Sequence, residues 1–422
     1  RGTDFQSLGD LRSATLNNDQ DAPIMMVQQL AETIDRCLQL PLESTSSGGL
    51  PAMTPTGAPL VVGTTGGVAI GDAEITGDML LRPNLASYGA GAGSDMVAAR
   101  TRRPTLRLHS VTRRLNSQPL SVLEAIPDAE HDAILQNAST YDAGDDLRTL
   151  FADAQVRQID LPNGLIRYSG AVVRDGTSPL KLRGTGSGQT ILRGTTAGSA
   201  LTFNGSGLHN FGMPRFELEG LRLEAGVANC GTAVRINNTG GSGYAGVGAL
   251  WQDVEIVPSA PGTWWNKGVH ATNLRNTRFS RVVIGSNAMT GEMTHCFHLD
   301  GTADPVEVWF DGFTYLYVAE RAIYCEGAYE GIYLNGINMT SVQEGLIVRP
   351  STAAEPVVHV LNSYINCRRA AVDLEKIAYF NIANNGISSV GTQGSGSFYA
   401  LKTNSTGIVN TSTFHNNSVL GG

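Results

Sequence analysis

Short strand-like segments recur along most of this 422-residue sequence, and their spacing limits the fold more than any other feature. From about Thr149 onward, segments such as "FELEGLRLEAG", "WQDVEIVPS" and "VHVLNSYINC" alternate β-branched or aromatic residues with polar ones. Strands that repeat every two to three dozen residues or so predict a solenoid, and we expect an all-β, right-handed parallel β-helix. The positions that we align between repeats are Leu221, Val254, Val282, Phe313, Ile337, Ile365 and Phe414.

Asparagines gather at the breaks between these segments. Asparagine tolerates left-handed backbone, and its amide can bond the turns above and below, so it suits the corners of a β-helix. A β-propeller, the main alternative, would show blades of about 40 residues with a Gly-His or Trp-Asp signature, which this sequence lacks. The asparagines concerned are Asn335, Asn338, Asn362, Asn366, Asn381, Asn384, Asn385, Asn416 and Asn417.

Composition divides the chain into three regions. Residues 1–45 hold one helix signal, "DAPIMMVQQLAETIDRCLQLP", with Asp21 as the N-cap and Pro23 in the first turn. Residues 46–148 begin with a linker rich in Gly, Ser, Thr and Pro and continue into short strand-like runs, and residues 149–422 hold the strand repeats. A short amphipathic helix is marginal alone, so we expect it to pack against its own chain or against a copy of itself. Its apolar stripe comprises Val27, Leu30, Ile34 and Cys37.

Charge and residue usage narrow the function classes. The formal net charge of −8, without a basic block, argues against a nucleic-acid partner, and no apolar run approaches the roughly 20 residues needed for membrane insertion. The five cysteines lie far apart and suit small buried hydrophobes in a protein made in a reducing cytoplasm. His295 and His298 form the one close histidine pair, with no acidic or thiol partner at a known ligand spacing. We therefore predict no metal and no cofactor.

Several segments resemble a known family. "LLRPNLASYGAGAGSDMV", "DDLRTLFADAQVRQIDLPNGLIRYSG" and "LKLRGTGSGQTIL" are similar, in this order, to the start of the pectate-lyase-like β-helix of bacteriophage tailspikes. There, a Leu-Arg-x-x-Leu-Ala stretch leads to a helix, a Leu-Pro-x-Gly strand and a Gly-x-Gly-x-x-Thr cap. "TDFQSLGDLRSATLNNDQDAPIMMVQQLAETIDRCLQLP" resembles the particle-binding end of tail fibres and spikes of short-tailed phages. "VLEAIPDAEHDAI" stands where the family has Asp-Phe-Gly-Ala.

This resemblance implies a homotrimer in the virion tail, made in the host cytoplasm. Residues 1–100 would bind phage tail or adaptor proteins, as a small helical and extended region ahead of the β-helix. The β-helix would bind bacterial surface polysaccharide and, in many members of the family, cleave it. Three classes stay open: a tailspike depolymerase (glycoside hydrolase or lyase), a non-catalytic receptor-binding or fibre-anchoring tail protein, and a free bacterial polysaccharide lyase.

The segment "PVEVWFDGF" is our first candidate for a glycan site. As a strand it places Glu307, Trp309 and Asp311 on one face, with an indole ring to stack a sugar and two carboxylates to accept its hydroxyl hydrogen bonds. We also expect substrate contacts from Tyr329. The adjacent tryptophans of "PGTWWNKG", Trp264 and Trp265, are either a sugar platform or a subunit contact.

Catalysis would need two carboxyl groups roughly 5 to 9.5 Å apart. Residues i and i+4 of an extended strand are about 13 Å apart, so Glu307 and Asp311 pair poorly unless the strand bends. We therefore predict Asp311 with Glu330 as the acid and base pair, with Glu307 and Glu326 as further candidates. The alternative for each is a solvated carboxylate on a soluble surface.

Overall fold

The computed structural model describes residues 119–205, 215–238, 248–301, 307–350, 356–390, 397–404 and 412–420, together with the backbone of six short strands between residues 52 and 110. The chain separates into two compact units, Arg1–Leu115 and Asn116–Gly422. Most of the described residues are in strands and few are in helices, which confirms an all-β protein. The helix expected near Asp21 and the "GAGAG" stretch lie outside the described residues.

The first unit contains two small antiparallel sheets. Strands β1 to β4 pair in sequence order, and β5 pairs with β6. The bounds are β1 (Ala52–Met53), β2 (Pro59–Val62), β3 (Val68–Ile70), β4 (Ala73–Ile75), β5 (Ala98–Ala99) and β6 (His109–Ser110).

The second unit begins with short helices beside its first strands. The segment "DDLRTLFADAQVRQIDLPNGLIRYSG" forms helix α5, strand β8, a turn and strand β9, in keeping with the helix and strand that the resemblance implies, whereas helix α4 was not predicted. The bounds are β7 (Leu120–Ser121), η3 (Val122–Glu124), α4 (Asp128–Leu135), α5 (Gly144–Ala152), β8 (Gln158–Asp160) and β9 (Gly164–Tyr168).

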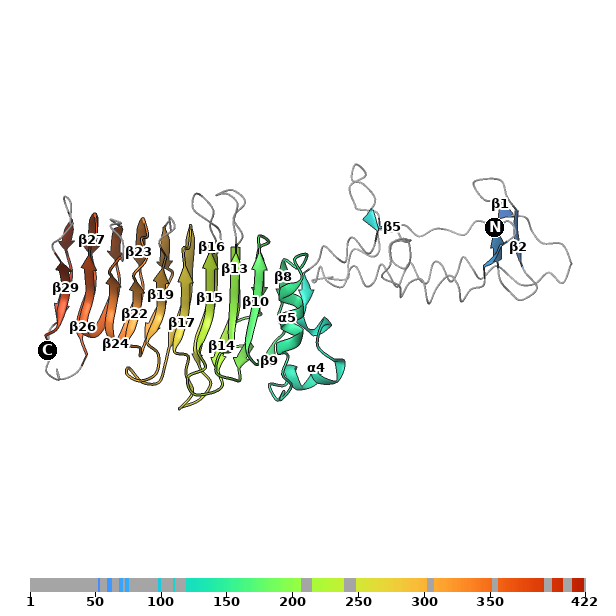
Figure 1. Ribbon diagram of the computed structural model, residues 1–422, viewed down its shortest axis with the longest axis horizontal. Coiled ribbons are helices and arrows are strands. Elements are labelled where there is room, and N and C mark those ends of the chain that lie inside the picture. The colour runs from blue at the N-terminus through green and yellow to red at the C-terminus, as the bar shows by residue number, and fades with distance from the viewer. Residues whose placement is uncertain are drawn as a thin grey trace, which may run out of the picture. The chain divides into compact units, whose positions relative to one another are not determined.

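One large parallel sheet of 25 strands, β7 to β31, makes up most of this unit. Each strand pairs with one from the next turn, as β10 does with β13 and β13 with β15, and one such row runs from β10 (green) to β29 (red) in Figure 1. The bounds are β10 (Ala171–Gly176), β11 (Leu180–Arg183), β12 (Thr190–Gly194), β13 (Ala200–Gly205), β14 (Arg215–Ala225), β15 (Thr232–Asn238), β16 (Gly248–Pro258), β17 (Lys267–Thr272), β18 (Thr277–Gly285), β19 (His295–Asp300), β20 (Val308–Asp311), β21 (Tyr315–Tyr317), β22 (Arg321–Cys325), β23 (Gly331–Asn335), β24 (Asn338–Val348), β25 (Val357–Leu361), β26 (Tyr364–Glu375), β27 (Tyr379–Ala383), β28 (Gly386–Ser389), β29 (Tyr399–Asn404), β30 (Thr413–His415) and β31 (Ser418–Leu420).

The register of the sheet tests the repeat alignment directly. Leu221 pairs with Val254 and Val254 with Val282, as expected. The alignment of the next residue, Phe313, is wrong. Phe313 lies in the turn after β20, where it is 87% exposed and has a left-handed φ of 67°. Farther on, the ladder partners of Ile365 are Met339 and Ile387, and Phe414 pairs with Ile382. The alignment fails after Val282 because the connections between the strands differ in length.

Side chains that alternate with the outward ones fill the interior. Val308 and Phe310 are buried while Trp309 between them is exposed, which confirms the alternation expected around "VEVWFDGF". Phe310 packs on Phe279 of the neighbouring strand, with ring centroids 5.2 Å apart. The described cysteines are free and buried, as expected for small hydrophobes: Cys230, Cys296, Cys325 and Cys367.

Asparagine side chains link successive strands at the corners. The Asn362 amide donates to the Asn335 side-chain oxygen at 3.0 Å, and both Asn362 and Asn384 have a left-handed φ. The Asn385 amide donates to the Asn417 side-chain oxygen at 2.9 Å and to the Val360 carbonyl at 2.8 Å. These contacts confirm the predicted corner role for the asparagines named here, whereas Asn366 and Asn381, also expected at breaks, lie within strands β26 and β27.

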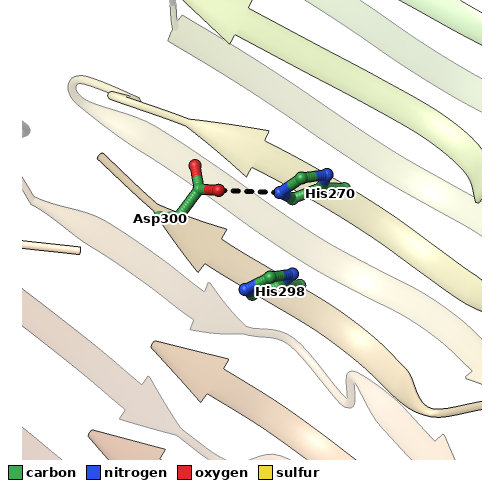
Figure 2. A group of neighbouring side chains, drawn as sticks. All are labelled: His270, His298 and Asp300. Carbon is green, nitrogen blue, oxygen red and sulfur yellow. Dashed lines mark hydrogen bonds and ion pairs between the residues drawn. The ribbon is translucent and has the colours of Figure 1, made fainter. Parts of the chain in front are cut away.

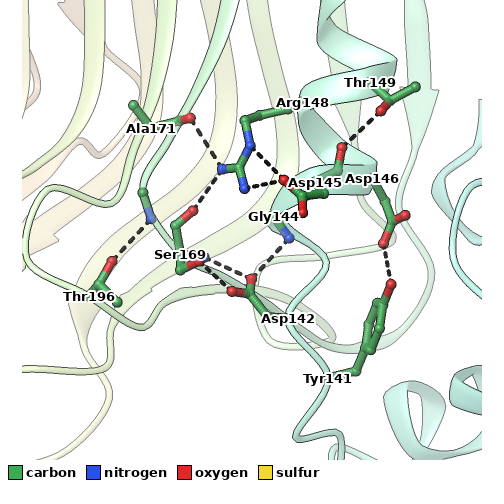
Figure 3. A network of polar contacts seen from close by, with 11 residues as sticks. Tyr141, Asp142, Gly144, Asp145, Asp146, Arg148, Thr149, Ser169, Ala171 and Thr196 are labelled. Carbon is green, nitrogen blue, oxygen red and sulfur yellow. Dashed lines mark hydrogen bonds and ion pairs between the residues drawn. The ribbon is translucent and has the colours of Figure 1, made fainter.

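Asp142 ties the start of helix α5 to the turn after β9, as Figure 3 shows. One carboxylate oxygen accepts the backbone N–H of Gly144 at 3.0 Å and of Ser169 at 2.9 Å, and the other accepts the Ser169 hydroxyl. Burial raises the pKa of the Asp142 carboxyl, but the hydrogen bonds from Ser169 and Gly144 and the charge of Arg148 outweigh it, so the pKa is lowered. The ionised carboxylate therefore stabilises this junction.

We expect Asp142→Asn to lower the free energy of unfolding by about 1 kcal/mol at pH 7, a small value because the carboxyl is partly exposed. Since the folded pKa is depressed, this stabilisation is present above the unfolded-state pKa of about 3.9 and is lost as the pH falls through the folded value. Urea unfolding at pH 7 and pH 3 measures it. Asp145→Asn is the control, because Asp145 lies on the same turn and makes an exposed ion pair with Arg148. An Asp142 effect equal at both pH values would contradict the prediction.

Candidate functional site

A cleft with a volume of about 540 Å³ crosses the outer face of the sheet at "VEVWFDGF". Its lining comes from five strands that lie next to one another, β14, β16, β18, β20 and β23. Neighbouring strands are about 4.8 Å apart, so the cleft extends over roughly 19 Å across the strands. This shape suits an extended chain molecule better than a compact one. Residues that line it include Leu250, Arg278, Glu307, Trp309, Asp311 and Asn335.

Trp309 forms the aromatic part of this cleft. Its ring stacks on Tyr333 of the next strand, with centroids 4.1 Å apart and planes 10° apart, and Trp309 remains 40% exposed. Glu307 holds both rings, because it accepts hydrogen bonds from the Trp309 indole N–H and the Tyr333 hydroxyl, each at 3.3 Å. Burial raises the pKa of the Tyr333 hydroxyl, and the charge of Glu307 raises it further, so the hydroxyl stays a donor.

Asp311 lies two residues farther along the same strand and makes an ion pair with Arg278. The Asp311 Oδ2 atom is 2.6 Å from Nη2 and 2.7 Å from Nε of Arg278, whose side chain is 61% exposed. Asp311 Oδ1 is buried and accepts no hydrogen bond from the described residues. The cleft thus offers hydrogen-bond donors, acceptors and an aromatic face on one rigid ladder.

The predicted pairing of Asp311 with Glu330 does not match the register. Phe310 pairs with Leu334, so the residue next to Asp311 on the adjacent strand is Asn335, five residues beyond Glu330. Five residues of strand span about 16 Å, too far for a shared glycosidic bond. Of the four proposed catalytic carboxylates, the structure brings only Glu307 and Asp311 to the cleft.

The remaining predicted substrate contacts lie elsewhere. Trp265 and Tyr329 are fully buried, so neither ring presents a face to a sugar. Tyr329 instead donates to the Asp300 carbonyl at 3.2 Å and accepts the Leu274 N–H at 3.3 Å. Trp264 is half-buried and joins no described part of the cleft.

A second polar group lies on strands β17 and β19 and at Glu326, directly after β22. His270 and His298 are register partners whose rings stack at 4.5 Å, and His270 Nε2 lies 2.8 Å from Asp300 Oδ2 (Figure 2). His298 Nε2 lies 2.6 Å from a carboxylate oxygen of Glu326, the fourth proposed catalytic residue. Lys267 Nζ contacts Nδ1 of His298 at 2.7 Å.

Burial is the largest cause of the lowered pKa values of His298, Lys267 and the neighbouring His295. It lowers the pKa of His298, although Glu326 opposes the shift, and it lowers the pKa of Lys267. Burial and the charges of neighbouring groups lower the pKa of His295 to about 3. Sequence analysis singled out His295 and His298 but missed His270, because two histidines one repeat apart become neighbours only through the register.

Comparisons with known proteins find no match, either to a protein-family model or to a curated protein. No helix among the described residues is long and apolar enough to span a membrane.

Proposed function

We propose that this protein is a tailspike or tail fibre protein of a short-tailed bacteriophage and that it attaches the virion to host cell-surface polysaccharide. The observation that carries the proposal is the Trp309 cleft, where a stacked indole and phenol adjoin Glu307 and the Arg278–Asp311 pair. Sugars are bound by aromatic faces together with polar groups that satisfy their hydroxyls.

In this proposal the parallel sheet is wound as a right-handed parallel β-helix. Three such chains form a homotrimer in the virion tail, and residues 1–100 bind tail or adaptor proteins. The sequence resemblance supports this arrangement, and the stacking of the strands in the second unit is compatible with it. A rigid ladder fits the role, because it holds the groups of the cleft in place before the polymer arrives.

Cleavage of the bound polysaccharide is the second candidate function. It is favoured by Glu307 and Asp311, two carboxylates that line one cleft. Asp311 Oδ2 is already paired with Arg278 and Oδ1 is buried, so neither oxygen faces a substrate freely, and binding without cleavage is the function that the geometry supports best.

The test is binding of the purified full chain to a panel of capsular and O-antigen polysaccharides, with release of reducing or unsaturated ends followed in parallel. We expect Trp309→Ala to weaken binding by about ten- to a hundred-fold, because an aromatic side chain that becomes buried when the ligand binds carries much of the binding energy. Tyr364→Ala is the matched control, since Tyr364 is a similarly exposed aromatic residue outside the cleft.

Three results would decide the proposal. No binding of any polysaccharide, or equal loss in the Trp309 and Tyr364 variants, would contradict attachment through this cleft. Release of ends that disappears in a Glu307→Gln, Asp311→Asn double variant would establish a depolymerase. If the wild-type protein binds a polysaccharide but releases no ends, the protein is a non-catalytic receptor-binding protein.

A further inference from the structure

The His270, His298 and Asp300 side chains form a compact set of possible metal ligands on the neighbouring strands β17 and β19. Their donor atoms all lie within 4.8 Å of one another. His298 and Asp300 lie on β19, and His270 lies directly opposite His298 on β17. Figure 2 shows the two imidazole rings parallel, with the carboxylate directed at His270. We propose that these three residues bind a first-row divalent transition metal ion, with Glu326 as a fourth ligand.

The chemistry of the donors selects the class of ion. Imidazole nitrogen with carboxylate oxygen suits Mn²⁺, Fe²⁺, Co²⁺, Ni²⁺ or Zn²⁺, whereas Mg²⁺ and Ca²⁺ prefer oxygen alone. His270 Nε2 and Asp300 Oδ2 are 2.8 Å apart. Two atoms at this separation, each about 2.1 Å from one ion, subtend an angle of about 85°, close to the right angle of six-coordinate geometry and smaller than the tetrahedral angle. This favours a six-coordinate ion over tetrahedral zinc, and in the order Mn²⁺ < Fe²⁺ < Co²⁺ < Ni²⁺ of affinities Ni²⁺ should bind most tightly.

The surroundings supply the remaining ligands and a path for the ion. Asp300 Oδ1 is buried without a hydrogen bond from the described residues, so a second oxygen is available at the site. Glu326 already lies 2.6 Å from His298 Nε2 and is partly exposed, as are the His270 and Asp300 side chains. The ion would therefore replace the protons that now join each imidazole to its carboxylate.

Lys267 is expected to weaken binding of the metal ion. Its amine contacts His298 Nδ1 at 2.7 Å, and this contact must be broken or the amine must lose its proton when the ion arrives. We therefore expect micromolar rather than nanomolar affinity. Because the ligands come from two neighbouring strands, the bound ion cross-links successive strands and stabilises the folded chain.

The experiment is calorimetric titration of the tag-free full chain with NiCl₂, together with thermal unfolding and the absorption spectrum of the Co²⁺ form. We expect one Ni²⁺ per chain, a higher unfolding temperature with the ion, and the weak visible band of six-coordinate Co²⁺. Each of His270→Gln and His298→Gln should weaken binding at least tenfold, and Asp300→Asn should do so as well.

His415→Gln serves as the control, because His415 is an exposed histidine on β30, away from this group. It should bind Ni²⁺ like wild type. Circular dichroism and the metal-free unfolding temperature check that each variant folds, and Asp300→Asn provides the test if a histidine variant does not. No binding by wild type, or unchanged binding in the folded variants, would overturn the proposal. Neither result depends on polysaccharide binding.

Discussion

Replacing Arg174 with methionine is expected to lower the free energy of unfolding of the second unit by about 3–5 kcal/mol. Arg174 lies on strand β10, is 1% exposed and packs next to the C-terminal end of α5. Its guanidinium donates to the carbonyls of four residues in and after the last turn of that helix, Phe151, Asp153, Ala154 and Val156. A cation there also interacts favourably with the helix dipole.

The loss is large because methionine leaves the buried Phe151 carbonyl without its donor and removes the donor from three part-buried carbonyls as well. Urea unfolding followed by circular dichroism measures it. Arg183→Met is the matched control, because Arg183 lies on the adjacent strand β11 and its exposed ion pair with Asp160 is worth at most about 1 kcal/mol. Equal effects of the two variants would show that Arg174 does not hold the helix in place.

The all-β, parallel character of the second unit follows from local features of the sequence. Alternation places Val308 and Phe310 inside and Trp309 outside, which depends only on the two-residue period of a strand. Asn362 and Asn384 mark corners because the left-handed backbone there favours asparagine over most other residues. Such features need no knowledge of which strands are neighbours.

Features that depend on register were harder to predict. Phe313 lies in an exposed turn, although the repeat spacing aligned it with the buried Val254 and Val282, because the connection lengths vary. The same variation separates Asp311 from Glu330. It also hides His270 from an argument based on nearby histidines, since its ladder partner His298 comes one full turn later in the chain, on β19.

Burial of aromatic residues was the other unpredicted feature. Tyr329 was expected to contact substrate and Trp265 to be a sugar platform or a subunit contact, but both rings are enclosed. Hydrophobicity alone does not separate a ring that packs in the core from one that faces a ligand, and near a turn the two-residue alternation no longer decides the side. Trp309 was placed correctly because it lies within a regular strand.

Trp251 gives the second large expected effect, and Trp309 provides its internal comparison. Trp251 is fully buried on β16, where its indole N–H donates to the Phe216 carbonyl at 3.1 Å and its ring meets Phe279 edge-on at 5.1 Å. We expect Trp251→Ala to lower the free energy of unfolding by about 3–5 kcal/mol, from the lost contacts and the cavity left behind.

Trp309→Ala removes the same side chain from the outer face of the same sheet, so it should cost about 1 kcal/mol or less, mainly from the stacking with Tyr333. Urea unfolding of both variants checks the difference. If Trp309→Ala were as destabilising as Trp251→Ala, the indole at 309 would be part of the packed structure, and its loss could not be used to test sugar binding. A large difference between the two variants in free energy of unfolding, together with weakened polysaccharide binding only in Trp309→Ala, would show that Trp251 stabilises the fold and that Trp309 contacts the ligand.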